Sequence, residues 1–165
     1  MAYKGKYQVI NIKKYSGDYT NVIYRSLWER KYMSHLDTQS NVLKWASEPF
    51  WIQYFSEVHN KYKRYYPDFW VRVKTSNGIK EFIIEIKPHK ETVAPKEVTD
   101  KRKQRRYLRE VSVYVVNQNK WKAARKYAAR NNMVFKVVTE KQLGLDRNGK
   151  TRSVQTSNRQ SSRTR

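Results

Sequence analysis

Two segments with alternating polarity, residues 64–74 and 79–87, are separated by the short stretch Ser76-Asn77-Gly78. Alternation of apolar and polar side chains is typical of β-strands that bury one face. Asn-Gly is the strongest short-range hairpin signal, so the pattern predicts two neighbouring antiparallel strands. With Asn-Gly as a two-residue type I′ loop, Ser76 lies opposite Ile79, which fixes the register of the hairpin.

This register predicts three charged side chains on one face of the hairpin. Asp68 lies opposite Lys87, and Glu85 lies two residues from Lys87 on the same strand. Acidic residues are depleted in strands, so the pair needs an explanation. A surface ion pair worth about 0–1 kcal/mol is one reading; two carboxylates converging on one hard cation is the other. The opposite face is apolar, with Phe69, Val71, Val73, Phe82, Ile84 and Ile86.

A helix is predicted before this hairpin. Apolar residues recur at three- and four-residue steps from Tyr24 to Leu36, after a cluster of capping residues that ends at Asn21. The segment from Ser26 to Glu29 also fits a capping box, in which Glu29 would fold back on the Ser26 amide. The spacing that includes Tyr24 favours the earlier start, which leaves Glu29 in mid-helix and free to reach the sheet.

The rest of the chain predicts a mixed α/β domain. Residues 41–55 read as extended chain broken by Pro49, residues 100–130 as a helix, and residues 133–139 as a strand. The β-branched run at residues 111–116 is compatible with a strand as well as with the helix. The order helix, three strands, helix, strand indicates one domain built around a single sheet.

The charge indicates a polyanionic partner. Lys and Arg number 36 against 14 Asp and Glu, a net charge of +22, and nucleic acid is the commonest partner of such a chain. The absence of cysteine excludes disulfides and thiolate zinc sites, and we expect a soluble protein of a reducing compartment. No apolar run approaches the roughly 20 residues that span a bilayer, and no glycine motif suits a nucleotide cofactor, so neither a membrane nor a nucleotide is expected as a partner.

Two parts of the chain are candidates for contact with DNA. The first is a run of basic residues at the start of the predicted second helix, interpreted as a phosphate-binding surface: Lys101, Arg102, Lys103, Arg105, Arg106 and Arg109. The second consists of Tyr66 and Trp70, which share the face of Asp68. Residues 147–165 contain six basic residues and no acid, and we expect a disordered basic arm there, after a domain at residues 1–146.

Tyr66-Pro67-Asp68 followed by Glu85-Ile86-Lys87 resembles the PD-(D/E)XK nuclease motif, with Glu29 in the position of the acidic residue on the preceding helix. Residues 17–30, 65–69 and 85–88 resemble the head completion nucleases of T-even-type phages. The segments at residues 120–124 and 139–141 are similar to that family and to the endonuclease subunit of Tn7-like transposases. The resemblance covers about residues 1–145.

The resemblance implies a restriction-endonuclease-like core of order αβββαβ and a DNA endonuclease that depends on Mg²⁺, with Mn²⁺ as a substitute. Asp68 and Glu85 would ligate the metal with the Ile86 backbone carbonyl, and Glu29 would bind or orient it. Lys87 would act on the attacking water or on the transition state.

The resemblance also implies a role in phage head completion, in which packaged DNA ends are processed or protected before the tail joins. DNA and head or portal proteins would be the partners, and the virion head and the host cytoplasm the locations. An alternative is a non-catalytic virion protein that binds DNA ends and the portal with a nuclease-like scaffold. A basic RNA-binding module would explain the charge but would leave Asp68 and Glu85 unexplained.

Overall fold

A computed structural model describes residues 3–144 of the chain. It contains helices and strands in the order β1 (Gly5–Tyr7), η1 (Ile12–Lys14), η2 (Tyr19–Asn21), β2 (Val22–Tyr24), α1 (Leu27–Thr38), β3 (Val42–Ser47), β4 (Ile52–Ser56), β5 (Lys61–Tyr65), β6 (Phe69–Thr75), β7 (Gly78–Ile86), η3 (His89–Glu91), α2 (Lys101–Arg130) and β8 (Val134–Val138). The predicted arm at residues 147–165 and the end of the predicted domain at residue 146 lie outside the described residues.

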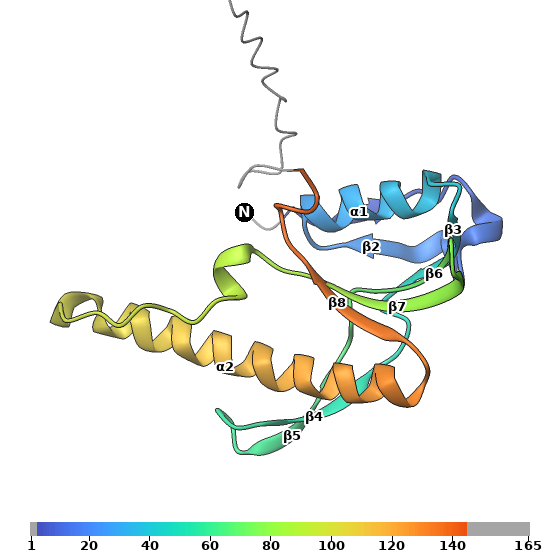
Figure 1. The fold of residues 1–165 in the computed structure, drawn as a ribbon. Coiled ribbons are helices and arrows are strands. Elements are labelled where there is room, and N and C mark those ends of the chain that lie inside the picture. The colour runs from blue at the N-terminus through green and yellow to red at the C-terminus, as the bar shows by residue number, and fades with distance from the viewer. Residues whose placement is uncertain (1–2, 145–165) are drawn as a thin grey trace, which may run out of the picture.

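A four-stranded mixed sheet forms the centre of the molecule, with the strand order β3-β6-β7-β8. Its first three strands are antiparallel neighbours, and β8 runs parallel to β7 after the α2 crossover. Figure 1 shows α1 and α2 on opposite sides of this sheet, so the prediction of a mixed α/β fold is confirmed. Two small antiparallel pairs, β1–β2 and β4–β5, lie outside this sheet. The β1–β2 pair is additional to the predicted elements, whereas β4 lies mostly within residues 41–55, which were predicted to be extended.

Each helix covers one face of the sheet with a separate apolar cluster. On the α1 side, Met33 and Leu36 pack with Trp45, Phe69 and the other apolar residues of the central strands. On the α2 side, Ala124 packs with Ile52, Tyr54 and Tyr65 of the β4–β5 hairpin. This hairpin therefore lies against α2, beyond the central sheet (Figure 1).

The β6–β7 hairpin exists as predicted, but its register differs by two residues. Thr75 pairs with Gly78 and Phe69 pairs with Ile84, so Asp68 lies opposite Glu85 and not opposite Lys87. A type I′ loop requires positive φ at both central residues. Ser76 and Asn77 form the loop without positive φ, and Gly78 has φ 105°. A shift of two residues preserves the faces of both strands, so Asp68, Glu85 and Lys87 still emerge on one side.

Two predicted element boundaries are wrong. α1 begins at Leu27, because the Ser26 hydroxyl caps it by accepting from the Glu29 backbone N–H at 3.1 Å. Tyr24, which had suggested an earlier start, lies in β2 and pairs with Gly5. The predicted strand at residues 64–74 is two strands, β5 and β6, which belong to different sheets. The break is Tyr66-Pro67-Asp68, where proline removes a backbone donor.

The helical prediction for residues 100–130 is confirmed, including the β-branched run. Asp100 caps α2 through its carboxylate, which accepts from the Arg102 N–H at 2.9 Å. The first ten residues of α2 are almost entirely exposed, and in Figure 1 this end of the helix projects beyond the body. Within residues 3–144, no helix combines the length and the apolar character needed to cross a membrane.

Candidate active site

Asp68 and Glu85 are brought together at one end of β6 and β7, on the face of the sheet that α2 covers. Glu85 alternates with Ile84 and Ile86, which belong to the apolar cluster on the α1 side, so its side chain points the other way. It is only 3% exposed. Asp68 immediately precedes β6 and is partly buried. Asp68 and Glu85 therefore lie next to each other, as predicted. They are directly opposite on neighbouring strands, whereas the prediction placed them diagonally.

Both carboxylates are held by short hydrogen bonds. The Ile86 backbone N–H donates to Asp68 Oδ2 at 2.6 Å. The Tyr65 hydroxyl donates to Glu85 Oε2 at 2.7 Å, in a buried contact that links the end of β5 to β7. The Glu48 N–H donates to the backbone carbonyl of Asp68 at 3.0 Å, which anchors the segment before β6. The two bonds to the carboxylates are charge-assisted, and such bonds fix the orientation of an acid more firmly than neutral hydrogen bonds do.

The charges of the two carboxylates repel each other. Burial and the adjacent Glu85 carboxylate raise the pKa of Asp68 well above its usual range, and Glu29 raises it further. The Ile86 N–H and the charge of Lys87 act in the opposite direction. Two adjacent acids whose charges repel, one of them buried, are costly for a fold, and such perturbed groups concentrate at functional sites.

Two lysines border the acids. Lys87 Nζ lies 3.4 Å from Glu85 Oε1, and although burial alone would lower its pKa, Glu85 and Asp68 raise it above the usual value. Lys120 reaches the site from α2 and lies over the ring of Tyr65, 5.6 Å from its centroid. Burial and the charge of Lys87 lower the pKa of Lys120. The site thus combines two acids with two ammonium groups.

Glu29 occupies the N-terminal cap of α1 and is not free in mid-helix as predicted. Its Oε2 accepts from the Arg25 N–H at 2.8 Å, and its Oε1 accepts from the Ser26 hydroxyl at 3.0 Å. The arrangement is a capping box closed one residue earlier on the chain. Even so, Glu29 is close enough to raise the pKa of Asp68, so the cap holds this third carboxylate at the border of the acidic pair.

The donor set suits a hard divalent cation. Carboxylate oxygens are the ligands that Mg²⁺ and Mn²⁺ prefer, and Mg²⁺ commonly uses one or two carboxylates with water and substrate phosphates. Of the two carboxylate oxygens of Asp68, Oδ2 accepts the Ile86 N–H. Among residues 3–144, no three His, Asp or Glu side chains gather as a ligand cluster. The residues present therefore fit a cation held by Asp68 and Glu85 and completed by other oxygens.

The residues predicted to contact DNA fall in two places. The six basic residues, Lys101, Arg102, Lys103, Arg105, Arg106 and Arg109, are all exposed on the projecting end of α2. At 1.5 Å per residue they lie about 16–29 Å from Lys120 along the helix axis, so they do not border the acids. Tyr66 is exposed beside the acids, whereas Trp70 is partly buried and donates its Nε1–H to Glu81 Oε2 at 3.0 Å.

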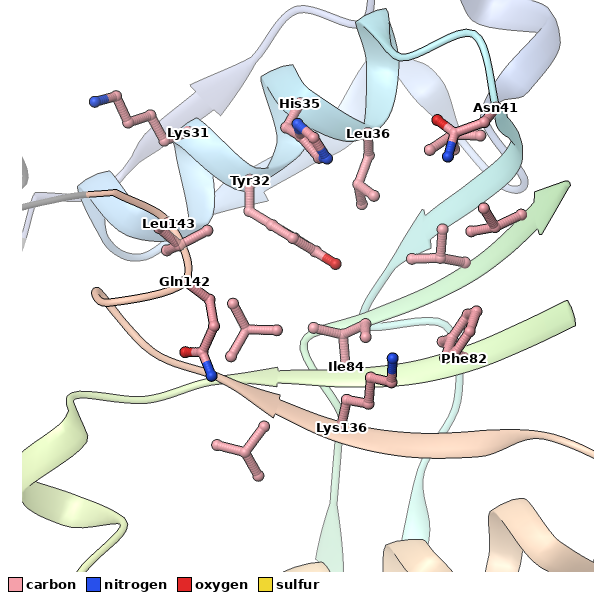
Figure 2. Close-up of a pocket in the computed structure, with 15 residues that line it drawn as sticks. Lys31, Tyr32, His35, Leu36, Asn41, Phe82, Ile84, Lys136, Gln142 and Leu143 are labelled. Atoms are coloured by element: carbon pink, nitrogen blue, oxygen red, sulfur yellow. The ribbon is translucent and has the colours of Figure 1, made fainter. Parts of the chain in front are cut away.

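A separate pocket of about 800 Å³ lies on the other side of the sheet (Figure 2). It opens between α1 and the strands β7 and β8, where Tyr32, Leu36 and Ile84 line it together with Lys136. None of the described residues that line it carries a carboxylate. Because the acidic pair faces α2, this apolar pocket takes no part in the chemistry of the pair.

Tyr65 and Lys120 are site residues whose position the sequence did not predict. The sequence pattern predicts Tyr65 in one strand with Asp68, and only the break at Pro67 brings its hydroxyl onto Glu85. Lys120 was one of many basic residues on a predicted helix. Its distinguishing signal is its place three residues after buried Asn117 and four before buried Ala124, the spacing of one helix face.

Comparison with known proteins identifies the family. Residues 39–140 match the model of the TnsA-like endonuclease N-terminal domain. The chain belongs to the TnsA-like endonuclease family. It is also 41% identical over 143 residues to the protein named head completion nuclease of Enterobacteria phage T4, which covers 85% of this chain and 93% of that protein. No solved structure has significant similarity to the chain. The matched region of this TnsA-like endonuclease contains Asp68, Glu85 and Lys87.

Proposed function

We propose that this TnsA-like endonuclease hydrolyses DNA phosphodiesters with a divalent cation, Mg²⁺ or Mn²⁺, held by Asp68 and Glu85 with the Ile86 carbonyl. The observation that carries the proposal is the buried acidic pair, in which the pKa of Asp68 is raised by burial and by Glu85. Acids with perturbed pKa values concentrate at functional sites, which supports a ligand for this pair. Membership of an endonuclease family and a net charge of +22 support DNA as the substrate.

Each residue of the site has a separate task in this proposal. A bound cation would neutralise charge on the scissile phosphate and lower the pKa of a water molecule. Tyr65 and the Ile86 N–H hold the two acids in place through the bonds described above. Lys87 supplies a positive charge next to Glu85, where it stabilises negative charge that develops on the phosphate. Glu29, held in the cap of α1 near Asp68, would help to orient the cation.

Contacts outside the site would position the substrate. The exposed basic residues at the start of α2 bind phosphates, and Tyr66 and Trp70 contact the substrate near Asp68. The phosphate contacts carry no base-specific information, because they set register and orientation only.

We further propose that the protein acts in phage head completion, with head or portal proteins as partners, in the virion head and in the host cytoplasm. The relative of phage T4 that carries the name head completion nuclease supports this role. The pocket on the α1 side lies on the face of the sheet away from the acidic pair, so a protein bound there would leave the pair accessible to DNA.

Cleavage of plasmid and linear DNA tests the enzymatic proposal. Wild-type protein is expected to cut with Mg²⁺ or Mn²⁺ and to stop cutting with EDTA. Asp68→Asn keeps the shape of the side chain and removes its charge, so cutting is expected to fall by several orders of magnitude while DNA binding persists. Lys87→Ala is expected to reduce cutting as well.

Glu97→Gln is the matched control, since Glu97 is an exposed acid in the segment before α2. It is expected to cut like the wild type. If wild-type protein binds DNA but cuts none of the substrates with either metal, the enzymatic proposal is wrong and the protein is a DNA-binding structural component.

A further inference from the structure

The outward face of the β4–β5 hairpin is unusually aromatic for an exposed surface. Trp51, Phe55, Tyr62 and Tyr66 lie on or beside this hairpin and are between 41% and 68% exposed. The alternate residues Ile52, Tyr54 and Tyr65 point inward and pack on α2. The hairpin therefore has a structural face and a second face whose large rings make no contribution to the core.

The exposed rings are ordered into a short row. Phe55 pairs with Tyr62 across the hairpin, with ring centroids 5.2 Å apart and an interplanar angle of 71°. The Arg64 guanidinium lies 4.7 Å from the centroid of Trp51. From Tyr62 to Tyr66 the row extends about 13 Å along the strand. Its inner end is Tyr66, two residues before Asp68, so the row begins at the proposed active site.

Basic side chains of α2 border the same face. Phe55 and Tyr62 line a groove of about 310 Å³ together with Lys122 and Lys126, which are one helical turn apart on α2. Among the described residues that line this groove, Glu57 is the only acid. Aromatic rings beside a row of cations suit a chain that presents both flat bases and phosphates.

We propose that this surface binds the unpaired strand of a DNA end or branch, so that the enzyme prefers substrates with single-stranded DNA next to the cleaved bond. The inference rests on the proposed endonuclease function and specifies its substrate. Stacking of bases on exposed aromatic rings, combined with a positively charged groove, is how proteins bind single strands without sequence preference. In a duplex the faces of the bases are covered, so the exposed rings have no partner there.

Binding without metal tests the surface independently of catalysis. Fluorescence anisotropy in EDTA would compare a labelled oligothymidine with a blunt duplex. Tyr62→Ala and Trp51→Ala are each expected to weaken binding of the oligothymidine by about 5- to 150-fold and to leave duplex binding within about twofold. Tyr62→Phe is expected to restore binding because it keeps the ring. Tyr19→Ala removes an exposed tyrosine outside the hairpin and is the matched control.

The lysines give a second readout. Lys122→Gln with Lys126→Gln is expected to lower the salt dependence of oligothymidine binding by about 1.4 in the log–log slope, about 0.7 for each phosphate. The proposal is overturned if wild-type protein does not bind oligothymidine, or if the tyrosine and tryptophan variants bind it as tightly as the control does. The second result would show that the aromatic face does not bind the unpaired strand.

Cleavage then separates the two proposals. Wild type is expected to cut a duplex with a single-stranded flap faster than a blunt duplex, and Tyr62→Ala to lose this preference while it cuts the blunt duplex at the wild-type rate. Equal rates on both substrates would contradict the preference while the endonuclease proposal stands. Absence of cutting on either substrate, with aromatic-dependent binding intact, would contradict the endonuclease proposal alone.

Discussion

Glu29 has two roles in this account, and they can be separated by two substitutions. Its carboxylate closes the cap of α1, where it accepts from the Arg25 N–H and the Ser26 hydroxyl, and it also lies near Asp68. Ser26→Ala removes the hydroxyl that accepts from the Glu29 N–H at 3.1 Å but keeps the carboxylate. Glu29→Gln keeps an oxygen for the Arg25 N–H but removes the charge.

Ser26→Ala is expected to lower stability but not cleavage, and Glu29→Gln to lower cleavage but not stability. Loss of an N-cap hydroxyl costs about 1 kcal/mol, which lowers Tm by about 3 °C for a domain of this size, and Ser26→Ala is expected to cut DNA within about twofold of wild type. Glu29→Gln is expected to unfold within about 1 °C of wild type, because glutamine also serves in capping boxes. Its cleavage rate is expected to fall by about 10- to 100-fold, the usual effect of losing an outer-sphere partner of a metal.

Thermal unfolding by circular dichroism and initial cleavage rates with Mg²⁺ measure both quantities on the same preparations. Glu29→Gln protein that cuts at the wild-type rate would refute the second role and leave Glu29 as a helix cap alone. A large loss of both stability and cutting in Ser26→Ala would refute the separation of the two roles.

Three further predictions concern the buried acid, the core and the basic end of α2. Tyr65→Phe leaves a buried oxygen of Glu85 without its donor, so urea unfolding without metal is expected to show a loss of about 1–3 kcal/mol; unchanged stability would contradict the bond. Burial, with the charge of a neighbouring acid, raises the pKa of Tyr7 to about 12. The folded state therefore holds this proton more firmly than the unfolded state, and stability should be intact below pH 10 and fall as the pH rises toward 12, less so in Tyr7→Phe. Arg105→Gln with Arg106→Gln is expected to reduce the salt slope of duplex binding by about 2, and an unchanged slope would place the phosphate contacts elsewhere.

Much of the site could be predicted because successive side chains of a strand point to opposite faces of the sheet. The alternation of polar and apolar residues assigns Asp68 and Glu85 to the same face whether the hairpin register is shifted by two residues or not. The choice of partner depends on loop geometry, and Asn-Gly suggested a type I′ loop. In the β6–β7 loop, positive φ instead occurs only at Gly78. The register therefore places Asp68 opposite Glu85 and not opposite Lys87.

The rest of the site depends on contacts between segments far apart in the chain. The β4–β5 hairpin forms its own two-stranded sheet and packs on α2. Neither the alternation of its residues nor the length of its strands indicates that it lies outside the central sheet. Only that placement brings Tyr65 onto Glu85 and Lys120 over Tyr65. The start of α1 differs from the prediction for a local reason, because the apolar spacing of Tyr24 continues the helical pattern although the residue lies in β2.

The most direct test of the central claim, that Asp68 and Glu85 hold a divalent cation, is a titration of Mn²⁺ followed by electron paramagnetic resonance. We expect wild-type protein and Glu97→Gln to bind Mn²⁺ alike, and Asp68→Asn to bind it at least about tenfold more weakly. Equal binding by wild type and Asp68→Asn would contradict the account, because the buried acidic pair would then have no ligand.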